Sequence, residues 1–243
     1  MSQSDRDVVL VDGVRTPFAK AGTELREIHP AELGTRAVSE LFTRSGVDVN
    51  QIDEVIMGNT GNPSDSVNIS RVVALRSGVP LKTSAFTVHR NCASALESIT
   101  TGYDKIKSGT LDVVVAGGTE NMSQMPILMP KKMQDIIMRA SMSKSTPQAL
   151  AQLWNLLKAD LGQIKAMATG DFKSSLAPIP SIMEGLTDPF VGINMGQTAE
   201  ILAKEFGLSR AVQDEFAMLS HQKAVAAQKN GRLAQEIVPV FIP

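Results

Sequence analysis

Between residues 54 and 118, three short apolar runs alternate with two segments of helical periodicity. The runs are Glu54–Met57, Ala85–Val88 and Leu111–Ala116, and the last of them is rich in β-branched residues. One helical segment is centred on Ile69–Val73, and the other extends from Cys92 to Ile106. Strands that alternate with helices pair in parallel, because each helical connection crosses the sheet. The sequence therefore predicts a layered α/β fold for this part of the chain.

Two further segments extend this pattern toward the N-terminus. Val8–Val11 is an apolar run of strand type that ends at Asp12. Apolar residues at helical spacing follow Pro30, which suits the first position of a helix, and Gly46 is a natural stop. We expect residues 1–121 to form an α/β unit.

The composition of the sequence changes after about Asn121. Six of the 12 Met residues lie between Met122 and Met142. Residues 171–188 are rich in Pro and Ser, which predicts a loop, and the last eight residues, EIVPVFIP, resemble a strand. Apolar residues at helical spacing predict helices over 147–168, 196–206 and 210–229. We therefore expect a mostly helical second unit over residues 122–243.

Charge and composition exclude several classes of protein. The net charge is −1 and the pI about 6.3, whereas nucleic-acid-binding domains usually have a pI above about 9. One Cys cannot form an internal disulfide, and one Cys with three His is too few for a structural zinc site, so no metal is expected. The polar start is not a secretory signal, and no run approaches the roughly 18 apolar residues of a membrane span. We expect a cytoplasmic protein.

The segment Phe86–Ser94, FTVHRNCAS, places Cys92 at a turn between a strand and a helix. A helix N-terminus has a partial positive charge and unsatisfied N–H groups, which stabilise a thiolate and an oxyanion. This placement suits acyl transfer through a thioester on Cys92. The alternative is that Cys92 packs in the core as a small hydrophobe, as free Cys often does.

A nucleophile needs a base, and the residues alone do not show a complete pair. His89 lies three residues before Cys92 and could face the sulfur or merely end the strand. Glu120 could serve as an acid or base, although an exposed loop carboxylate is the more common role. Gly117 and Gly118 lack the spacing of a dinucleotide-binding loop. The Met-rich stretch could line an acyl channel or fill a core.

Several blocks of the sequence, taken together, resemble the thiolase family over almost the whole chain. Each block alone is weak, but their joint order and spacing are specific. The blocks are Val14–Phe18 (VRTPF), Asn68–Arg71 (NISR), Asn91–Ser94 (NCAS), Ala116–Ser123 (AGGTENMS), Met195–Glu200 (MGQTAE), Gln213–His221 and Glu236–Pro239.

The resemblance implies a fold, an activity and a substrate. The fold would be a thiolase-like layered α/β half, incomplete, with an inserted and mostly helical loop domain that covers coenzyme A. Cys92 would take the acyl group of a 3-ketoacyl-CoA as a thioester, and CoA would then release the shortened acyl-CoA; the reverse is a Claisen condensation. Asn194 and Met195 fall where family members line the pantetheine and acyl pocket. CoA is thus a substrate, and no permanently bound cofactor is expected.

Two details resemble one subgroup of the family, the β-oxidation thiolases that pair with a hydratase/dehydrogenase subunit in a trifunctional complex. Ala95 stands where many thiolases have Gly, and the Met122–Phe172 region is long. The resemblance implies a homo-oligomer and such a partner subunit, with Lys131–Ala168 meeting the partner or a membrane.

Three features of the second half of thiolases are absent from these 243 residues: the G-H-P motif with the family's base, a second Cys in a C-x-G setting, and the N-E-A-F segment. Three hypotheses follow. The chain works with a second chain that supplies the rest, or it is an inactive thiolase relic that serves as a binding or scaffold protein, or it is an autonomous hydrolase that uses Cys92 and His89. A ketoacyl-synthase-type condensing enzyme shares the fold, but the AGGTENMS and MGQTAE blocks favour a thiolase.

Overall fold

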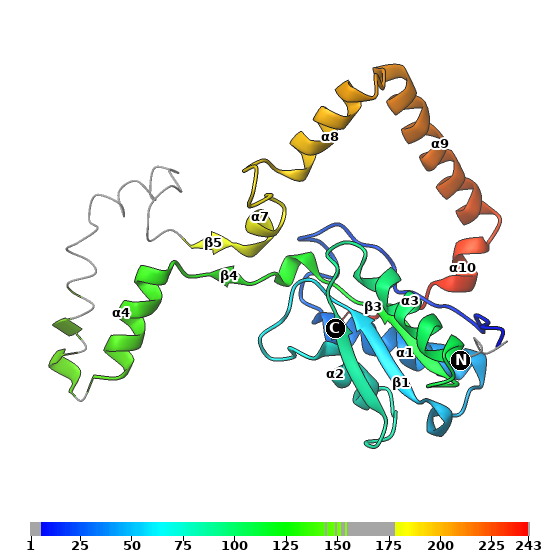
Figure 1. The fold of residues 1–243 in the computed structure, drawn as a ribbon, viewed down its shortest axis with the longest axis horizontal. Coiled ribbons are helices and arrows are strands. Elements are labelled where there is room, and N and C mark those ends of the chain that lie inside the picture. Colours follow the sequence, from blue (N-terminus) through cyan, green and yellow to red (C-terminus); the bar gives the residue numbers. More distant parts are fainter. Residues whose placement is uncertain (1–5, 144, 149, 152–153, 155–177, 243) are drawn as a thin grey trace. The chain divides into compact units, whose positions relative to one another are not determined.

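The computed structural model describes residues 6–143, 145–148, 150–151, 154 and 178–242. The chain divides into two compact units (Figure 1), one within the spans Met1–Gln124 and Gly207–Pro243, the other within Met125–Phe206. The expected domains 1–121 and 122–243 stay a prediction. The first unit contains the α/β core, and the second contains short helices and a two-stranded sheet.

A three-stranded parallel sheet forms the centre of the first unit, as the sequence predicts. Its order is β2-β1-β3, with β1 at Glu54–Gly58, β2 at Ser84–Val88 and β3 at Val114–Gly118. Gly58 pairs with Val88 on one side and with Gly118 on the other, so all three strands end in register. The segments that follow the three strands therefore begin at the same edge of the sheet.

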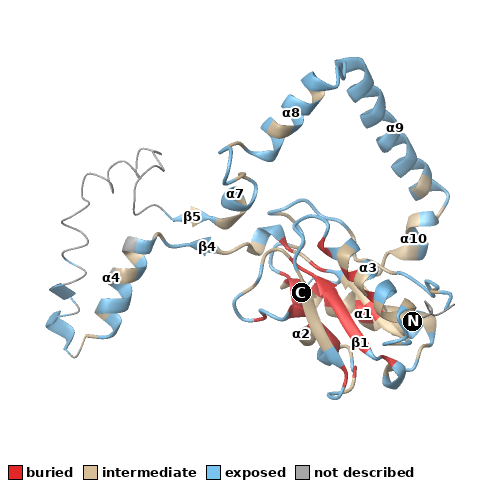
Figure 2. Cartoon of the chain, viewed as in Figure 1, coloured by how far each residue is buried: buried red, intermediate tan, exposed pale blue. Residues whose placement is uncertain are grey.

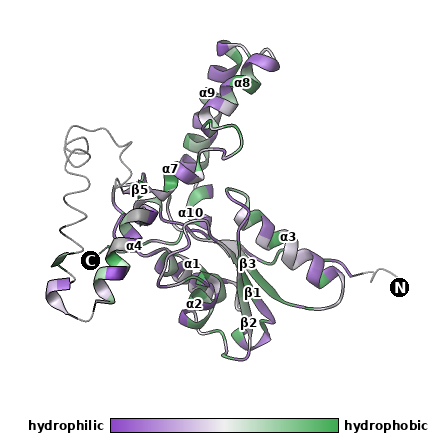
Figure 3. Ribbon diagram, turned by 60° about the vertical axis from the view of Figure 1, so that its left-hand side comes forward, coloured by the Kyte–Doolittle hydropathy of each residue, from purple (hydrophilic) through white to green (hydrophobic). Residues whose placement is uncertain are grey.

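The helices cover both faces of this sheet because the chain reverses direction across it. α2 (Ile69–Arg76) connects β1 to β2, and α3 (Ser94–Lys107) leads back past β1 to β3. Right-handed crossovers in opposite directions place their helices on opposite faces. Figure 3 shows this arrangement, with α2 and α1 (Pro30–Ser45) on one face and α3 on the other. The point of reversal lies between β1 and β3, which is where open α/β sheets bind ligands.

The hydrophobic core lies between β1 and the helices α1 and α2. All five residues of β1 are buried, since this strand is central in the sheet (Figure 2). Val55 and Met57 point to the α1 and α2 side, and Ile56 points to the other face. The helix ends follow the predicted signals: Pro30 begins α1 and Gly46 ends it in the left-handed conformation.

α3 meets the sheet with small residues. Ser94, Ser98 and Gly102 are the residues of α3 that are buried. Leu96 is 62% exposed and Tyr103 is 48% exposed, so these large apolar residues lie on the open side of the helix. The expected helix is present, and its contact with the sheet is made by small residues, whose close packing a periodicity of large residues does not detect.

Two predicted strands differ from the structure near the edges of the sheet. Val8–Val11 belongs to no strand, and Leu10 is 86% exposed, because an extended run needs a pairing strand and none of the described residues pairs with this run. β3 starts at Val114 instead of Leu111. The cause of this shift is Asp53, whose carboxylate accepts the backbone N–H groups of Asp112 (2.8 Å) and Val113 (2.9 Å). As an edge strand, β3 has only Val115 fully buried.

The C-terminal part of the first unit consists of two helices. α9 spans Arg210–Lys229 as predicted and begins at the N-cap Ser209. The strand expected over EIVPVFIP is wrong: α10 (Arg232–Glu236) includes the first residue of this segment, and only a single bridge joins Ile237 to Arg15. Among the described residues, α9 has no buried side chain, and none of their helices is long and apolar enough to cross a membrane. Two 3-10 turns complete the unit, at Val49–Gln51 and Met122–Gln124.

The second unit consists of short elements. Among its described residues are the helices α4 (Lys131–Ser141), α7 (Ser181–Gly185) and α8 (Met195–Glu205), and residues 146–148, 150–151 and 154 are also helical. Strands β4 (Ile127–Leu128) and β5 (Ile179–Pro180) pair in antiparallel fashion. The loop predicted for 171–188 is therefore partly wrong, since its described end contains β5 and α7. Of the helix predicted for 147–168, residues 147–148, 150–151 and 154 are helical as expected, and the other residues lie outside the described part of the chain.

The role of Asp53 is testable through the pH dependence of stability. The N–H groups of Val113 and Asp112 hold the pKa of Asp53 below its ordinary value. A lowered folded-state pKa stabilises the fold at neutral pH, and this stabilisation is lost as the pH falls through that value. We expect Asp53→Asn to lower the free energy of unfolding by about 1 kcal/mol at pH 7, after solvent screening. Urea titrations should show this difference shrinking below about pH 4, near the ordinary Asp value. A difference that is constant down to pH 2 would contradict the assignment.

Candidate active site

The turn between β2 and α3 is tight and presents Cys92. Asn91 has a φ of +47°, a left-handed conformation that Asn tolerates better than most residues. Ser94 ties the turn together, because its hydroxyl donates to the carbonyl of Asn91 (2.6 Å) and accepts the N–H of Arg90 (2.8 Å). Cys92 is exposed, which excludes the alternative that it fills a core.

Cys92 lies immediately before the N-terminus of α3. The N-cap of this helix is Ala93, which offers no side-chain cap. The N–H of Ser94, the first residue of the helix, donates to the carbonyl of Asn91 (3.1 Å), while no side chain of the described residues caps the N–H groups that follow it. The 14-residue helix adds the positive end of its dipole. A helix start of this kind favours negative charge, such as the oxyanion that forms when a nucleophile attacks a carbonyl.

Two glycines let α3 start directly above the ends of the strands. A Cβ on Gly58 would lie 2.4 Å from the carbonyl carbon of Ser94 and 2.5 Å from the nitrogen of Ala95. A Cβ on Gly118 would lie 2.7 Å from the Cβ of Ala95. Gly117 and Gly118 thus belong to β3 and serve packing, and they form no phosphate-binding turn.

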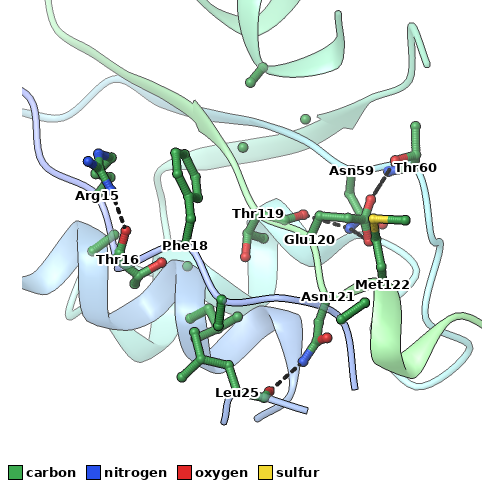
Figure 4. A pocket seen from close by; sticks show the side chains of 18 of the residues that line it. Arg15, Thr16, Phe18, Leu25, Asn59, Thr60, Thr119, Glu120, Asn121 and Met122 are labelled. Carbon is green, nitrogen blue, oxygen red and sulfur yellow. Dashed lines mark hydrogen bonds between the residues drawn. The ribbon is translucent and has the colours of Figure 1, made fainter. Parts of the chain in front are cut away.

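A cavity of about 500 Å³ lies at this edge of the sheet. Its walls come from the 14–26 segment, α1, the ends of β1 and β3, and the turn with Asn91 and Cys92. Figure 4 shows that residues following β1 and β3, such as Thr60 and Glu120, approach one another along this wall. Cys92 is therefore part of a cavity built by segments far apart in the sequence.

Side chains of the residues that follow β3 form hydrogen bonds to other segments that line the cavity. The Thr119 hydroxyl donates to the carbonyl of Pro30 at the start of α1 (2.5 Å). The buried amide of Asn121 donates to the carbonyls of Leu25 (2.8 Å) and Ile28 (2.7 Å). These side chains hold the 25–30 segment in place.

Glu120 is a hydrogen-bonded, half-buried group, and the expectation of an exposed loop carboxylate is wrong. Its Oε2 accepts the backbone N–H groups of Thr60 (2.8 Å) and Gly61 (3.0 Å) and the hydroxyl of Thr60 (2.5 Å). Its Oε1 accepts the amide of Asn59 (3.3 Å). The signal that could have identified it is its place close to the carboxyl end of a parallel strand, where parallel sheets form their sites.

His89 is not positioned as the base of Cys92. Its Nδ1 lies 3.5 Å from the backbone nitrogen of Asn91. Within the part of the chain that the structure describes, no hydrogen bond joins His89 to Cys92, and His89 does not line the cavity. The described residues also contain no group of three or more His, Cys, Asp or Glu side chains that could hold a metal ion.

Asn194 and Met195 belong to the second unit and begin α8. Asn194 is its N-cap and forms a capping box with Gln197, with both hydrogen bonds at 2.9 Å. The side chain of Asn194 is therefore engaged within its own helix, whereas Met195 is 46% exposed. Since Cys92 belongs to the first unit, a common site for these three residues stays a prediction.

Comparison with known proteins decides the family. Residues 8–243 match the family model described as thiolase, N-terminal domain. The chain belongs to the thiolase family. It is 34% identical over 241 residues to proteins named 3-ketoacyl-CoA thiolase from Yersinia pestis and Yersinia pseudotuberculosis, covering 99% of this chain. It is also similar to the crystal structure of the Bacillus anthracis acetyl-CoA acetyltransferase, with a TM-score of 0.76 and 28% identity over 97% of this chain.

This thiolase-family chain spans about half the length of the relatives it matches, since it covers 51% of each of them. Three of the motif blocks line the cavity with Cys92, namely Val14–Phe18, Asn91–Ser94 and part of Ala116–Ser123. The Met195–Glu200 block begins α8 in the second unit. The thiolase resemblance is thus spread over both units.

The close approach at Gly58 provides a test of the site architecture. We expect Gly58→Ala to lower the free energy of unfolding by about 1–3 kcal/mol, because a Cβ there meets backbone atoms that cannot easily move. Urea denaturation measures the change. Gly13→Ala is the matched control, since a Cβ on Gly13 meets nothing within 4 Å. Equal stability of the two variants would contradict the packing described.

Proposed function

We propose that this chain provides the nucleophilic half of a thiolase and receives the acyl group of a 3-ketoacyl-CoA on Cys92. The observation on which the proposal rests is the exposed Cys92 at the start of α3, on the wall of the cavity. Relatives named 3-ketoacyl-CoA thiolase support the substrate class.

The proposed reaction consists of two acyl transfers, the first from the substrate to Cys92 and the second from Cys92 to CoA. The Cys92 thiolate attacks the C3 carbonyl of the substrate, and N–H groups at the start of α3 stabilise the oxyanion. The C2–C3 bond then breaks, its electron pair stays on C2, and protonation of C2 releases acetyl-CoA. The thiolate of a second CoA attacks the acyl–Cys92 thioester, which releases the shortened acyl-CoA and restores the Cys92 thiolate. The same steps in reverse give the Claisen condensation.

The proton transfers need a group that the described surroundings of Cys92 do not supply. The Nδ1 of His89 faces the backbone nitrogen of Asn91 in the same turn, and the sequence has no G-H-P motif. We therefore include in the proposal a C-terminal thiolase half, in the same polypeptide or in a second chain, that supplies the base. An autonomous Cys–His hydrolase has no support in the geometry of His89.

The CoA contacts of the second unit are part of the same proposal. Met195 is the better candidate for an apolar contact with the pantetheine arm, since it is half-exposed at the first turn of α8. Asn194 would act by fixing the start of this helix. A hydratase/dehydrogenase partner stays a proposal, since much of the Lys131–Ala168 region assigned to it lies outside the described residues.

Trapping the acyl group tests the proposal. We expect the 243-residue chain to form a covalent acetyl adduct when incubated with acetyl-CoA, located on Cys92 by peptide mass spectrometry. Cys92→Ala should form none, and His89→Ala should form as much as the unaltered chain. Turnover of a 3-ketoacyl-CoA is expected only after a C-terminal thiolase half is added.

Two other outcomes would contradict the proposal. Turnover by the chain alone that His89→Ala abolishes would establish the autonomous Cys–His enzyme. A folded chain that forms no adduct, with or without a C-terminal half, would establish the inactive scaffold protein.

A further inference from the structure

We infer that Glu120 is a positioning residue for Cys92, which it controls through the 59–62 segment after β1. This inference rests on the proposed role of Cys92 as a nucleophile. Glu120 itself is hydrogen-bonded at both carboxylate oxygens, so it is committed to holding the protein and is not free to act as a base.

Glu120 is connected to Cys92 in two steps. The first step joins the segment after β3 to the segment after β1, where the direction of the chain across the sheet reverses. Glu120 follows β3, and the groups it binds follow β1. Charge-assisted hydrogen bonds to a carboxylate are about twice as strong as neutral ones. The Glu120 carboxylate therefore holds the segment after β3 against the segment after β1, at the edge of the sheet where the cavity lies.

The second step leads from the 59–62 segment to the cysteine turn. The backbone N–H of Asn59 donates to the carbonyl of Val88 (3.2 Å), the last residue before the turn. The carbonyl of Gly58 accepts the N–H of Thr119 (3.0 Å), and Gly58 lies against Ser94 and Ala95. Movement of the 59–62 segment would consequently displace both ends of the turn that presents Cys92.

A carboxylate at the opposite end of the same strands offers a matched control. Asp53 also accepts two backbone N–H groups, those of Asp112 and Val113, and like Glu120 it joins β1 to β3. It lies before the strands, whereas Glu120 lies after them. Loss of either carboxylate should reduce stability, but only loss of Glu120 should affect Cys92.

Alkylation of the thiol measures the position of Cys92 without any acyl-CoA. Cys92 is the only cysteine of the chain, so iodoacetamide incorporation reports on it alone. Measuring the native-state rate against pH separates a changed thiolate environment from reduced stability. The charged and titratable groups around the turn and the cavity are His89, Arg90, Glu97, Arg15, Lys20, Arg26 and Glu120.

We expect Glu120→Gln to lower the alkylation rate at pH 7 about tenfold and to shift the rate profile to higher pH, because an amide cannot accept all the N–H groups that the carboxylate binds. Asp53→Asn should leave the rate profile unchanged while lowering the urea midpoint. If Glu120→Gln does not fold, Thr60→Ala removes one of the hydrogen bonds and should shift the profile less, in the same direction.

Identical rate profiles for the unaltered chain and the folded Glu120 or Thr60 variant would overturn the inference, as would an equal shift in Asp53→Asn. Failure of the proposed function appears separately, as the absence of an acetyl adduct on Cys92 in the unaltered chain. A shifted alkylation profile without an adduct would keep the positioning role and reject the thiolase role.

Discussion

The structure of the first unit depends on the close approach of α3 to the ends of β1 and β3. Gly58 and Gly118 leave no room for a side chain, and the helix presents Ser94, Ser98 and Gly102 to the sheet. The hydroxyl of Ser98 lies 2.8 Å from the carbonyl of Gly117, so this contact is polar as well as tight. Since the helix begins directly above the strand ends, the residue before its N-cap is held at the edge of the sheet. That residue is Cys92.

The short segment after β3 organises the rest of the cavity. Its consecutive side chains bind three different parts of the chain: Thr119 binds the start of α1, Glu120 binds the segment after β1, and Asn121 binds the 25–28 segment. The cavity thus depends on a few polar side chains that are anchored by one strand. These side chains all belong to the AGGTENMS block, so this block holds several walls of the cavity together.

Much of this architecture could be predicted from the sequence. Patterns of apolar residues and end signals located α1, β1, α2 and α9 because these elements follow local rules. The strand–helix turn also placed Cys92 at a helix start, and the structure confirms this position. The family resemblance, confirmed by the comparisons, added the fold of the whole chain.

The errors concern contacts between distant segments. The face that α3 presents to the sheet could not be read from the sequence, because the contacts of Ser98 and Gly102 with the sheet leave no periodic apolar signal. Val8–Val11 has the composition of a strand, but composition cannot supply a pairing partner. Glu120 seemed exposed because its hydrogen-bond donors lie about 60 residues earlier in the sequence.

The proposed function requires Cys92 at the start of α3 to be an activated nucleophile. The most direct test compares the alkylation rate of Cys92 in the native chain with its rate in the urea-unfolded chain at the same pH. A positive helix end stabilises the thiolate only in the folded state, so the account predicts faster alkylation of the native chain near neutral pH. Slower alkylation of the native chain would show that the fold shields or deactivates this thiol, and it would contradict the account.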